Sequence, residues 1–218
     1  MRKIGGSLFF LLIGIVLIST SCAVNQKYTV TQADPDFKFS GTNVISVGVQ
    51  DQREPVVSQR NKPQLSGIIR GGWGNPFYVT TTSGRPLAED MCIVLSNALN
   101  KKGYQAIRVS LAPGDAYNDV LKRLSEKGAP QAVFLSFKEW KPDLGAGGNL
   151  GLNYDFKLQV VDSSGNVRAE KHLSGHDHLG KIKGMGFLKV YEKRVSDAFQ
   201  QKLEEMFNSP DMVEAMKK

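Results

Sequence analysis

Leu152-Asn153-Tyr154-Asp155-Phe156-Lys157-Leu158-Gln159-Val160 alternates apolar and polar side chains without a break. Successive side chains of a β-strand point to opposite faces, so this pattern predicts a strand with one buried face and one wet face. Ser163-Ser164-Gly165-Asn166 then predicts a tight turn, and a partner strand follows from Val167 to Leu173. The segment therefore predicts an antiparallel hairpin in a sheet with one face partly open to water.

The rest of the chain adds further strands and helices to this hairpin. Three more strands are expected at Val44–Val49, Tyr104–Val109 and Ala132–Phe137. Helical spacing of apolar residues, with Pro, Gly and charges at the ends, predicts helices at 86–102, 115–127 and 187–207, and a short one after Pro210. This order predicts an α/β fold of the α+β type, with a mixed β-sheet of about five strands and two or three helices packed mainly on one face.

The first twenty-two residues have the layout of a secretory signal that ends at a cysteine. Arg2 and Lys3 precede the segment Ile4–Ile18, which is apolar apart from Ser7. A signal core runs roughly 7–15 residues, whereas a membrane-spanning helix needs about 20. Residues 1–21 are therefore expected to be a signal peptide.

The small residues before Cys22 resemble the lipobox of bacterial lipoproteins, although Ser19 stands where that motif usually has Leu. The resemblance implies a diacylglycerol group and an amide-linked acyl chain such as palmitate on Cys22. Two or more acyl chains hold a protein stably at a membrane. Because Ala23 rather than Asp follows, it also implies the outer membrane, with the protein facing the periplasm. A secretory signal without lipidation is the alternative.

Composition and charge limit the remaining possibilities. Removing residues 1–21 takes away Arg2 and Lys3 and lowers the formal charge from +7 to +5. The basic residues are spread along the chain, whereas a nucleic-acid-binding protein usually concentrates them on one face, so no nucleic-acid partner is expected. We expect a tether at 22–43 and a single domain at 44–218.

A long stretch at 54–85 has no clear periodicity and is expected to be a loop. Structureless loops of this length are uncommon in compact domains and are often functional. Arg53 precedes it, and Trp73, Phe77 and Tyr78 lie within it. Exposed aromatic residues with an arginine are typical anchors of protein interfaces, so these four residues are the candidate partner-binding site. The alternative is that the aromatic side chains fold back over the sheet.

All three histidines lie close together, at His172, His176 and His178. In an extended strand they share one face, and with Asp177 beside them they resemble a metal-ligand set. A structural metal site needs four ligands in a closed geometry, and Gly175 interrupts the segment. We therefore expect no metal and no other cofactor, and the histidines remain only the weaker alternative.

Other motifs fail on inspection. Gly175 to Lys181 has P-loop spacing, but Ile182 stands where Ser or Thr is required. Cys92 lies in an apolar helical run, where a free cysteine behaves as a small buried hydrophobic residue. No Gly-x-Ser-x-Gly motif occurs, and no catalytic residue can be assigned. The sequence therefore favours a protein that is not an enzyme.

Three features together resemble the YajG-type envelope lipoproteins: Cys22 with its lipobox-like residues, the strand Val47–Arg53, and the helix ending Leu95-Ser96-Asn97-Ala98-Leu99 before Gly103-Tyr104. The hairpin around Asp162-Ser163-Ser164-Gly165 and the helix around Ser196–Phe199 follow in the expected order. The family has no established reaction, so the resemblance implies compartment and fold. The long stretch at 54–85 departs from its compact pattern.

The function expected from the sequence is that of a lipid-anchored, non-enzymatic cell-envelope lipoprotein. Its periplasmic domain would bind another envelope protein, and the membrane would be contacted through the lipid. One alternative is an auxiliary lipoprotein of an envelope transport system. Another is a metal-dependent envelope enzyme that uses the histidines at 172–178.

Overall fold

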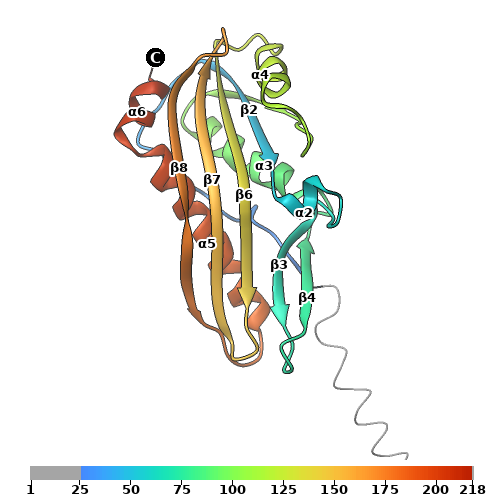
Figure 1. The fold of residues 1–218 in the computed structure, drawn as a ribbon. Helices are drawn as coiled ribbons and strands as arrows, with labels where there is room; N and C mark the ends of the chain where they lie inside the picture. The colour runs from blue at the N-terminus through green and yellow to red at the C-terminus, as the bar shows by residue number, and fades with distance from the viewer. Residues whose placement is uncertain (1–25, 218) are drawn as a thin grey trace, which may run out of the picture.

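A computed structural model describes residues 26–217, and three long antiparallel strands form the largest part of its sheet (Figure 1). These are β6 (Gln131–Leu144), β7 (Asn149–Asp162) and β8 (Val167–Lys181). Leu158 on β7 lies opposite Leu135 on β6 and Lys171 on β8. The apolar residues of the alternating segment are all buried, which confirms the predicted hairpin and its buried face.

Strand β6 joins this hairpin to the rest of the sheet, because its other edge pairs with two different strands. β2 (Val44–Asp51) runs parallel to the first half of β6, and β5 (Gln105–Val109) lies beyond β2. β3 (Leu65–Arg70) pairs with the last residues of β6, followed by β4 (Pro76–Thr81) and the short β1 (Lys27–Tyr28). The sheet therefore divides along one edge of β6.

Helices cover the two faces of the sheet unequally. α3 (Leu87–Lys101), α5 (Phe187–Phe207) and α6 (Pro210–Met216) contribute to the main core, with inward side chains such as Val133 and Leu135. α4 (Tyr117–Ser125) packs on the opposite face, over a second cluster that includes Ala132 and Phe134. Adjacent residues of one strand point to opposite faces, which is why two separate cores form on one strand.

The structure confirms a mixed α+β fold but corrects the expected number of elements. The sheet of the described chain has eight strands rather than about five. Five helices are described, the four predicted from the sequence and one more, and three of them pack on the face of the main core. The three additional strands are β1, β3 and β4, and the additional helix is the short α2 (Glu54–Val57). Residues 54–85 are therefore not a long loop: they form α2 and the β3–β4 hairpin.

The segment 26–43, expected to be a tether, is packed against the domain. Tyr28, Val30, Phe37 and Phe39 are buried in the main core. Backbone N–H groups between Thr29 and Lys38 donate to side chains of α5 and its C-cap, namely Glu192, Gln200, Glu204 and Asn208. From Thr29 to Lys38 these bonds replace a β-ladder, so the part of the segment after β1 runs along α5 without forming a strand.

The predicted signal peptide and Cys22 lie outside the described residues. Among residues 26–217, no helix is both long enough and apolar enough to cross a bilayer.

Candidate functional site

A cavity lies where the sheet divides, and we call it the fork cavity. β2 pairs with β6 up to Phe137 and β3 pairs with it from Asp143, so 138–142 lie between the two partners. A β-bulge between Phe137 and Glu139 falls at the same place. Bulges locally bend and twist a strand. The change of partner and the bulge together leave a space that α2 only partly closes.

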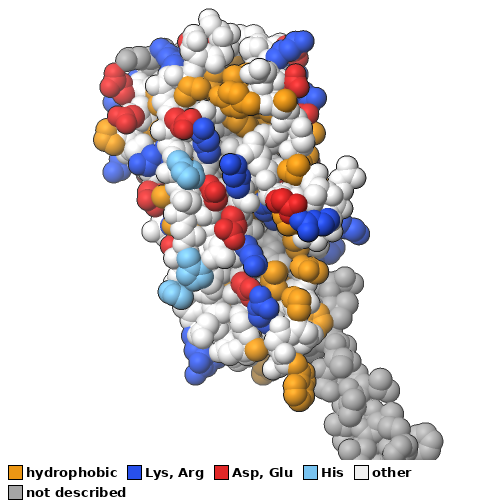
Figure 2. All heavy atoms as spheres, in the orientation of Figure 1, with side chains coloured by type: hydrophobic (Ala, Val, Ile, Leu, Met, Phe, Trp, Pro, Cys, Tyr) orange, Lys and Arg blue, Asp and Glu red, His pale blue; other side chains and the backbone are white. Residues whose placement is uncertain are grey.

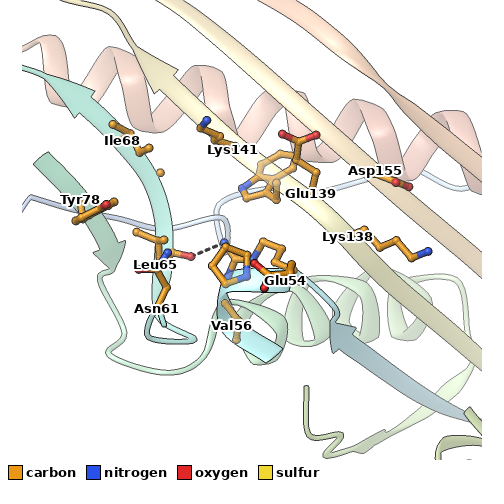
Figure 3. Close-up of a pocket in the computed structure, with 14 residues that line it drawn as sticks. Glu54, Val56, Asn61, Leu65, Ile68, Tyr78, Lys138, Glu139, Lys141 and Asp155 are labelled. Carbon is orange, nitrogen blue, oxygen red and sulfur yellow. Dashed lines mark hydrogen bonds between the residues drawn. The ribbon is translucent and has the colours of Figure 1, made fainter. Parts of the chain in front are cut away.

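The fork cavity has a volume of about 490 Å³ and opens on the face of the sheet opposite α5 (Figure 3). Its apolar lining consists of Pro55, Val56, Leu65, Ile68, Tyr78 and Trp140. Charged side chains of both signs stand around it, among them Glu54, Lys138, Glu139 and Lys141. An apolar hollow with a few polar groups at its margin is the usual form of a binding pocket.

Arg53 holds the wall of the fork cavity and is not free to contact a partner. Its guanidinium donates two hydrogen bonds to the Asp51 carboxylate, at 2.9 and 2.6 Å, and a third to the Leu65 carbonyl oxygen at 2.8 Å. It also lies 5.3 Å from the centre of the Phe137 ring, and the residue is only 7% exposed. Arg53 thus ties the end of β2 to the start of β3 where no strand pairing does so.

The floor of the fork cavity depends on close packing beneath β3. Trp140 is buried, and its indole N–H donates to the Tyr28 hydroxyl at 3.0 Å. A Cβ at Gly67 would lie closer than 3.0 Å to the Tyr191 hydroxyl oxygen, so only glycine fits there without a shift. Burial raises the pKa values of Tyr28 and Tyr191 far above the ordinary range. Both phenols therefore stay neutral and structural.

The three predicted aromatic residues are separated by the structure. Tyr78 lines the fork cavity and is 55% exposed. Phe77, next to it, is half-buried and packs beneath the β3–β4 turn, where it would meet a side chain placed at Gly71. Trp73 lies on that turn and is 99% exposed, but it does not line the cavity. Only Tyr78 is thus available in the cavity itself.

A second, smaller hollow of about 270 Å³ adjoins the first and shares Lys138 and Asp155 with it. It belongs to the wet face of β6, β7 and β8, where Figure 2 shows charged and histidine side chains gathered. Lys157 pairs with Glu170 at 2.9 Å across β7 and β8. The open sheet face is therefore a network of compensated charges rather than an apolar surface.

The predicted histidines do share the wet face of β8, which continues through Gly175 to Lys181. They bond to different neighbours: His172 to Asp155 at 2.7 Å, and His176 to Asn153. His176 and His178 have their ring centres 4.8 Å apart, edge to face. Within the described residues, no group of three or more His, Cys, Asp or Glu side chains could hold a metal ion.

Two other sequence motifs have structural roles. Gly175 to Lys181, with its P-loop spacing, is part of strand β8 and is not a loop that leads directly into a helix, as a phosphate loop must be. Cys92 is buried on α3, and its thiol lies 3.6 Å from the Val47 carbonyl oxygen. Burial raises the pKa of this thiol to about 11. Cys92 is therefore an unreactive core residue, as predicted.

Most of the cavity could not be predicted from the sequence, because its lining comes from segments that are far apart along the chain. Residues 53–56 follow β2, 65–78 span the β3–β4 hairpin, 138–141 lie on β6, and Asn61 and Asp155 add to the lining from the α2–β3 connection and from β7. The available signal was the run of β-branched and aromatic residues on either side of Gly71-Gly72-Trp73-Gly74-Asn75, which is typical of a hairpin.

No protein-family model and no curated protein matches this chain. Solved structures with some similarity include a Xanthomonas campestris protein assigned to the family model DUF330, at 7% identity, over 79% of this chain and 88% of that one, with a TM-score of 0.46. PelC from Paraburkholderia phytofirmans, a dodecamer, is 12% identical over 77% of this chain and 91% of the PelC chain, with a TM-score of 0.39. A lipoprotein from Neisseria meningitidis is 12% identical over 74% and 99%, with a TM-score of 0.29. At these TM-scores the similarities carry no functional argument.

Proposed function

We propose that this protein is a lipid-anchored, non-enzymatic lipoprotein of the bacterial outer membrane that binds another envelope protein through the fork cavity. The anchor is supported by the signal-like residues 1–21 and the lipobox-like approach to Cys22. The periplasmic orientation follows from the resemblance at Cys22 and Ala23. The binding role is carried by one observation, the open, largely apolar cavity where β2 and β3 separate.

The chemistry of the fork cavity favours an apolar side chain of a protein partner. Tyr78, Ile68 and Leu65 offer apolar contact, and tyrosine residues such as Tyr78 commonly anchor protein interfaces. Lys138 and Lys141 are exposed at the margin, with Glu54 and Glu139 near them, so a rim of mixed charge surrounds the apolar floor. An apolar centre with a polar rim is the usual anatomy of a protein interface.

A photo-crosslinking amino acid in place of Ile68 tests the binding role in cells that express the full-length protein. We expect one dominant envelope protein to be crosslinked. Tyr78→Ala should abolish that product, because it removes the exposed aromatic wall. Tyr117→Ala is the matched control, since Tyr117 on α4 is similarly exposed at 42% but does not line the cavity.

The outcomes separate the parts of the proposal. A product that survives Tyr78→Ala, or no specific product at all, would contradict binding through the fork cavity. Membrane transporter subunits as the captured partner would identify the protein as an auxiliary lipoprotein of a transport system. Membrane fractionation and fatty-acid labelling of a Cys22→Ala variant test the anchor separately. A variant that still fractionates with membranes and still labels with fatty acid would contradict lipidation at Cys22.

A further inference from the structure

Three loops meet at one end of the molecule, and we call this the loop end. They are the β3–β4 turn (71–75), the β6–β7 turn (145–148) and the β8–α5 loop (182–186), at the lower end of the sheet in Figure 1. Arg70 pairs with Asp143 at 2.7 Å, which ties the first two together. The Ile182 N–H donates to the Gly148 carbonyl oxygen at 2.7 Å, which ties the second to the third.

The loop end carries the two most exposed large hydrophobic side chains of the described chain. Trp73 is 99% exposed on the β3–β4 turn, and Met185 is fully exposed on the β8–α5 loop. Each stands between two glycines in the sequence, so neighbouring side chains shield neither of them. Single exposed apolar residues are ordinary, but a fully exposed tryptophan and methionine at one end of a fold indicate an apolar contact outside the chain.

The charge of this end is positive. From His178 to Tyr191 the chain contains Lys181, Lys183 and Lys189 and no acidic residue. All three lysines are exposed. Basic residues beside exposed aromatic and apolar side chains are typical of surfaces that meet anionic lipid headgroups, where tryptophan also accumulates.

The direction of β1 leads towards the same end. β1 is parallel to β4, with Lys27 opposite Thr80, so the backward direction along β1 points towards Pro76 and the β3–β4 turn. Cys22 precedes Lys27 by five residues, a length of chain that can span at most about 18 Å. The four residues from Thr80 back to Pro76 span about 13 Å. A lipid on Cys22 can therefore reach the level of the loop end.

From these observations we infer that the loop end docks on an anionic bilayer surface, with Trp73 and Met185 in the headgroup region and the lysines against the headgroups. This inference rests on the proposed lipid anchor, which keeps the domain beside the membrane. Docking would orient the sheet roughly along the membrane normal, so that the fork cavity stands above the surface and faces sideways.

Tryptophan fluorescence of the full-length lipidated protein in vesicles tests the inference. The chain has two tryptophans, and Trp140 is buried. Vesicles would contain phosphatidylglycerol and phosphatidylcholine, with chains brominated near the headgroup as quenchers. We expect blue-shifted emission that brominated lipid quenches, and loss of this quenching in Trp73→Phe, which retains only Trp140.

Charge reversal tests the lysines with a matched control. Each lysine near an anionic surface is worth roughly a fivefold change in the docking equilibrium. Lys181→Glu with Lys183→Glu should therefore restore water-exposed emission. Lys122→Glu with Lys127→Glu makes the same charge change on exposed residues at and just after α4 and should leave quenching intact.

Vesicle sedimentation separates this inference from the proposed anchor. Wild-type protein that sediments with vesicles but shows unquenched, water-exposed Trp73 emission would overturn the docking inference alone. Protein that does not sediment would overturn the anchor and the docking inference with it. Equal quenching in pure phosphatidylcholine vesicles, or equal loss in both charge-reversal variants, would also contradict docking through these lysines.

Discussion

The guanidinium of Arg53 links the end of β2 to the start of β3, two strands that no backbone pairing joins. Its partners are the Asp51 carboxylate, two residues earlier, and the Leu65 carbonyl oxygen, twelve residues later. The sequence predicted this arginine to be a candidate partner-binding residue, because local sequence contains no signal for the distant carbonyl group. Buried charges are retained when they are paired and hydrogen-bonded, as Arg53 is. The residue therefore shapes the cavity that a partner would enter.

Cys92 allows a prediction of how stability depends on pH. Burial raises the pKa of its thiol to about 11 in the folded protein, above the value near 9 of an exposed thiol. The folded state therefore holds the thiol proton more tightly than the unfolded state does. This difference contributes to the free energy of unfolding at neutral pH, and the contribution is lost as pH rises from about 9 to 11. By linkage the loss is roughly 3 kcal/mol at most.

Urea unfolding of the wild type and Cys92→Ala from pH 7 to 10.5 measures this effect. The wild type should lose more free energy of unfolding than the variant as pH rises, because only the wild type has this thiol to ionise. Other groups that titrate in this range are common to both proteins and cancel in the difference. Parallel pH profiles for the two proteins would show that the burial of Cys92 does not govern this stability.

At the scale of elements, the sequence predicted those whose apolar period is regular. The alternation of β7 and the long apolar stripes of α3 and α5 are visible in the local sequence, and these elements were predicted close to their observed bounds. β3 was missed because a register shift between Leu65 and Gly67 interrupts its alternation. The segment 26–43 was missed because its backbone bonds to α5, a partner more than 150 residues away.

The contact between that segment and α5 gives a prediction at Asn208. Its side-chain oxygen accepts from the Lys38 N–H at 2.7 Å, and its side-chain nitrogen donates to the Asp36 carbonyl oxygen at 3.1 Å. Asn208→Ala should lower the free energy of unfolding by about 1 kcal/mol, because these bonds lie at the surface. It should also speed hydrogen exchange of the Lys38 amide.

Gln201→Ala is the control for this experiment, since Gln201 is an exposed residue of α5 that makes none of these bonds. Exchange at Thr29, far from Asn208 along the segment, should change little because Glu192 holds that amide. Unchanged exchange at Lys38 in Asn208→Ala would indicate that the burial of Phe37 and Phe39, rather than the Asn208 bonds, holds this part of the segment in place.

At the scale of the whole molecule, the candidate site arises from the unequal covering of one sheet. The main core lies on the face with α3, α5 and α6, whereas α4 covers only one end of the other face. The fork cavity and the polar network occupy the part of that face which α4 does not cover, with only the short α2 at the side of the cavity. The alternating pattern of β7 predicts a partly open sheet face but not the cavity, because no local pattern specifies that β6 changes partner at residues 138–142.

The two cores should also differ in how they open. The cluster beneath α4 includes Val109, Val120, Leu124 and Phe134 and is much smaller than the main core. A small satellite core can open while the rest of the domain stays folded. We therefore expect α4 amides to exchange through a local opening of lower free energy than global unfolding.

Native-state hydrogen exchange of two Leu→Ala variants tests this expectation, since Leu99 on α3 and Leu124 on α4 are both buried. Leu99→Ala should lower the exchange free energy of α3 amides by about 3 kcal/mol but leave that of α4 unchanged. The reason is that a state with only α4 detached still buries residue 99. Leu124→Ala should lower both values, because it destabilises the native state from which both openings begin. If Leu99→Ala lowered the exchange free energy of α4 amides as much as that of α3 amides, the two faces of the sheet would unfold as one cooperative unit. The shape of the open face would then depend on the whole fold.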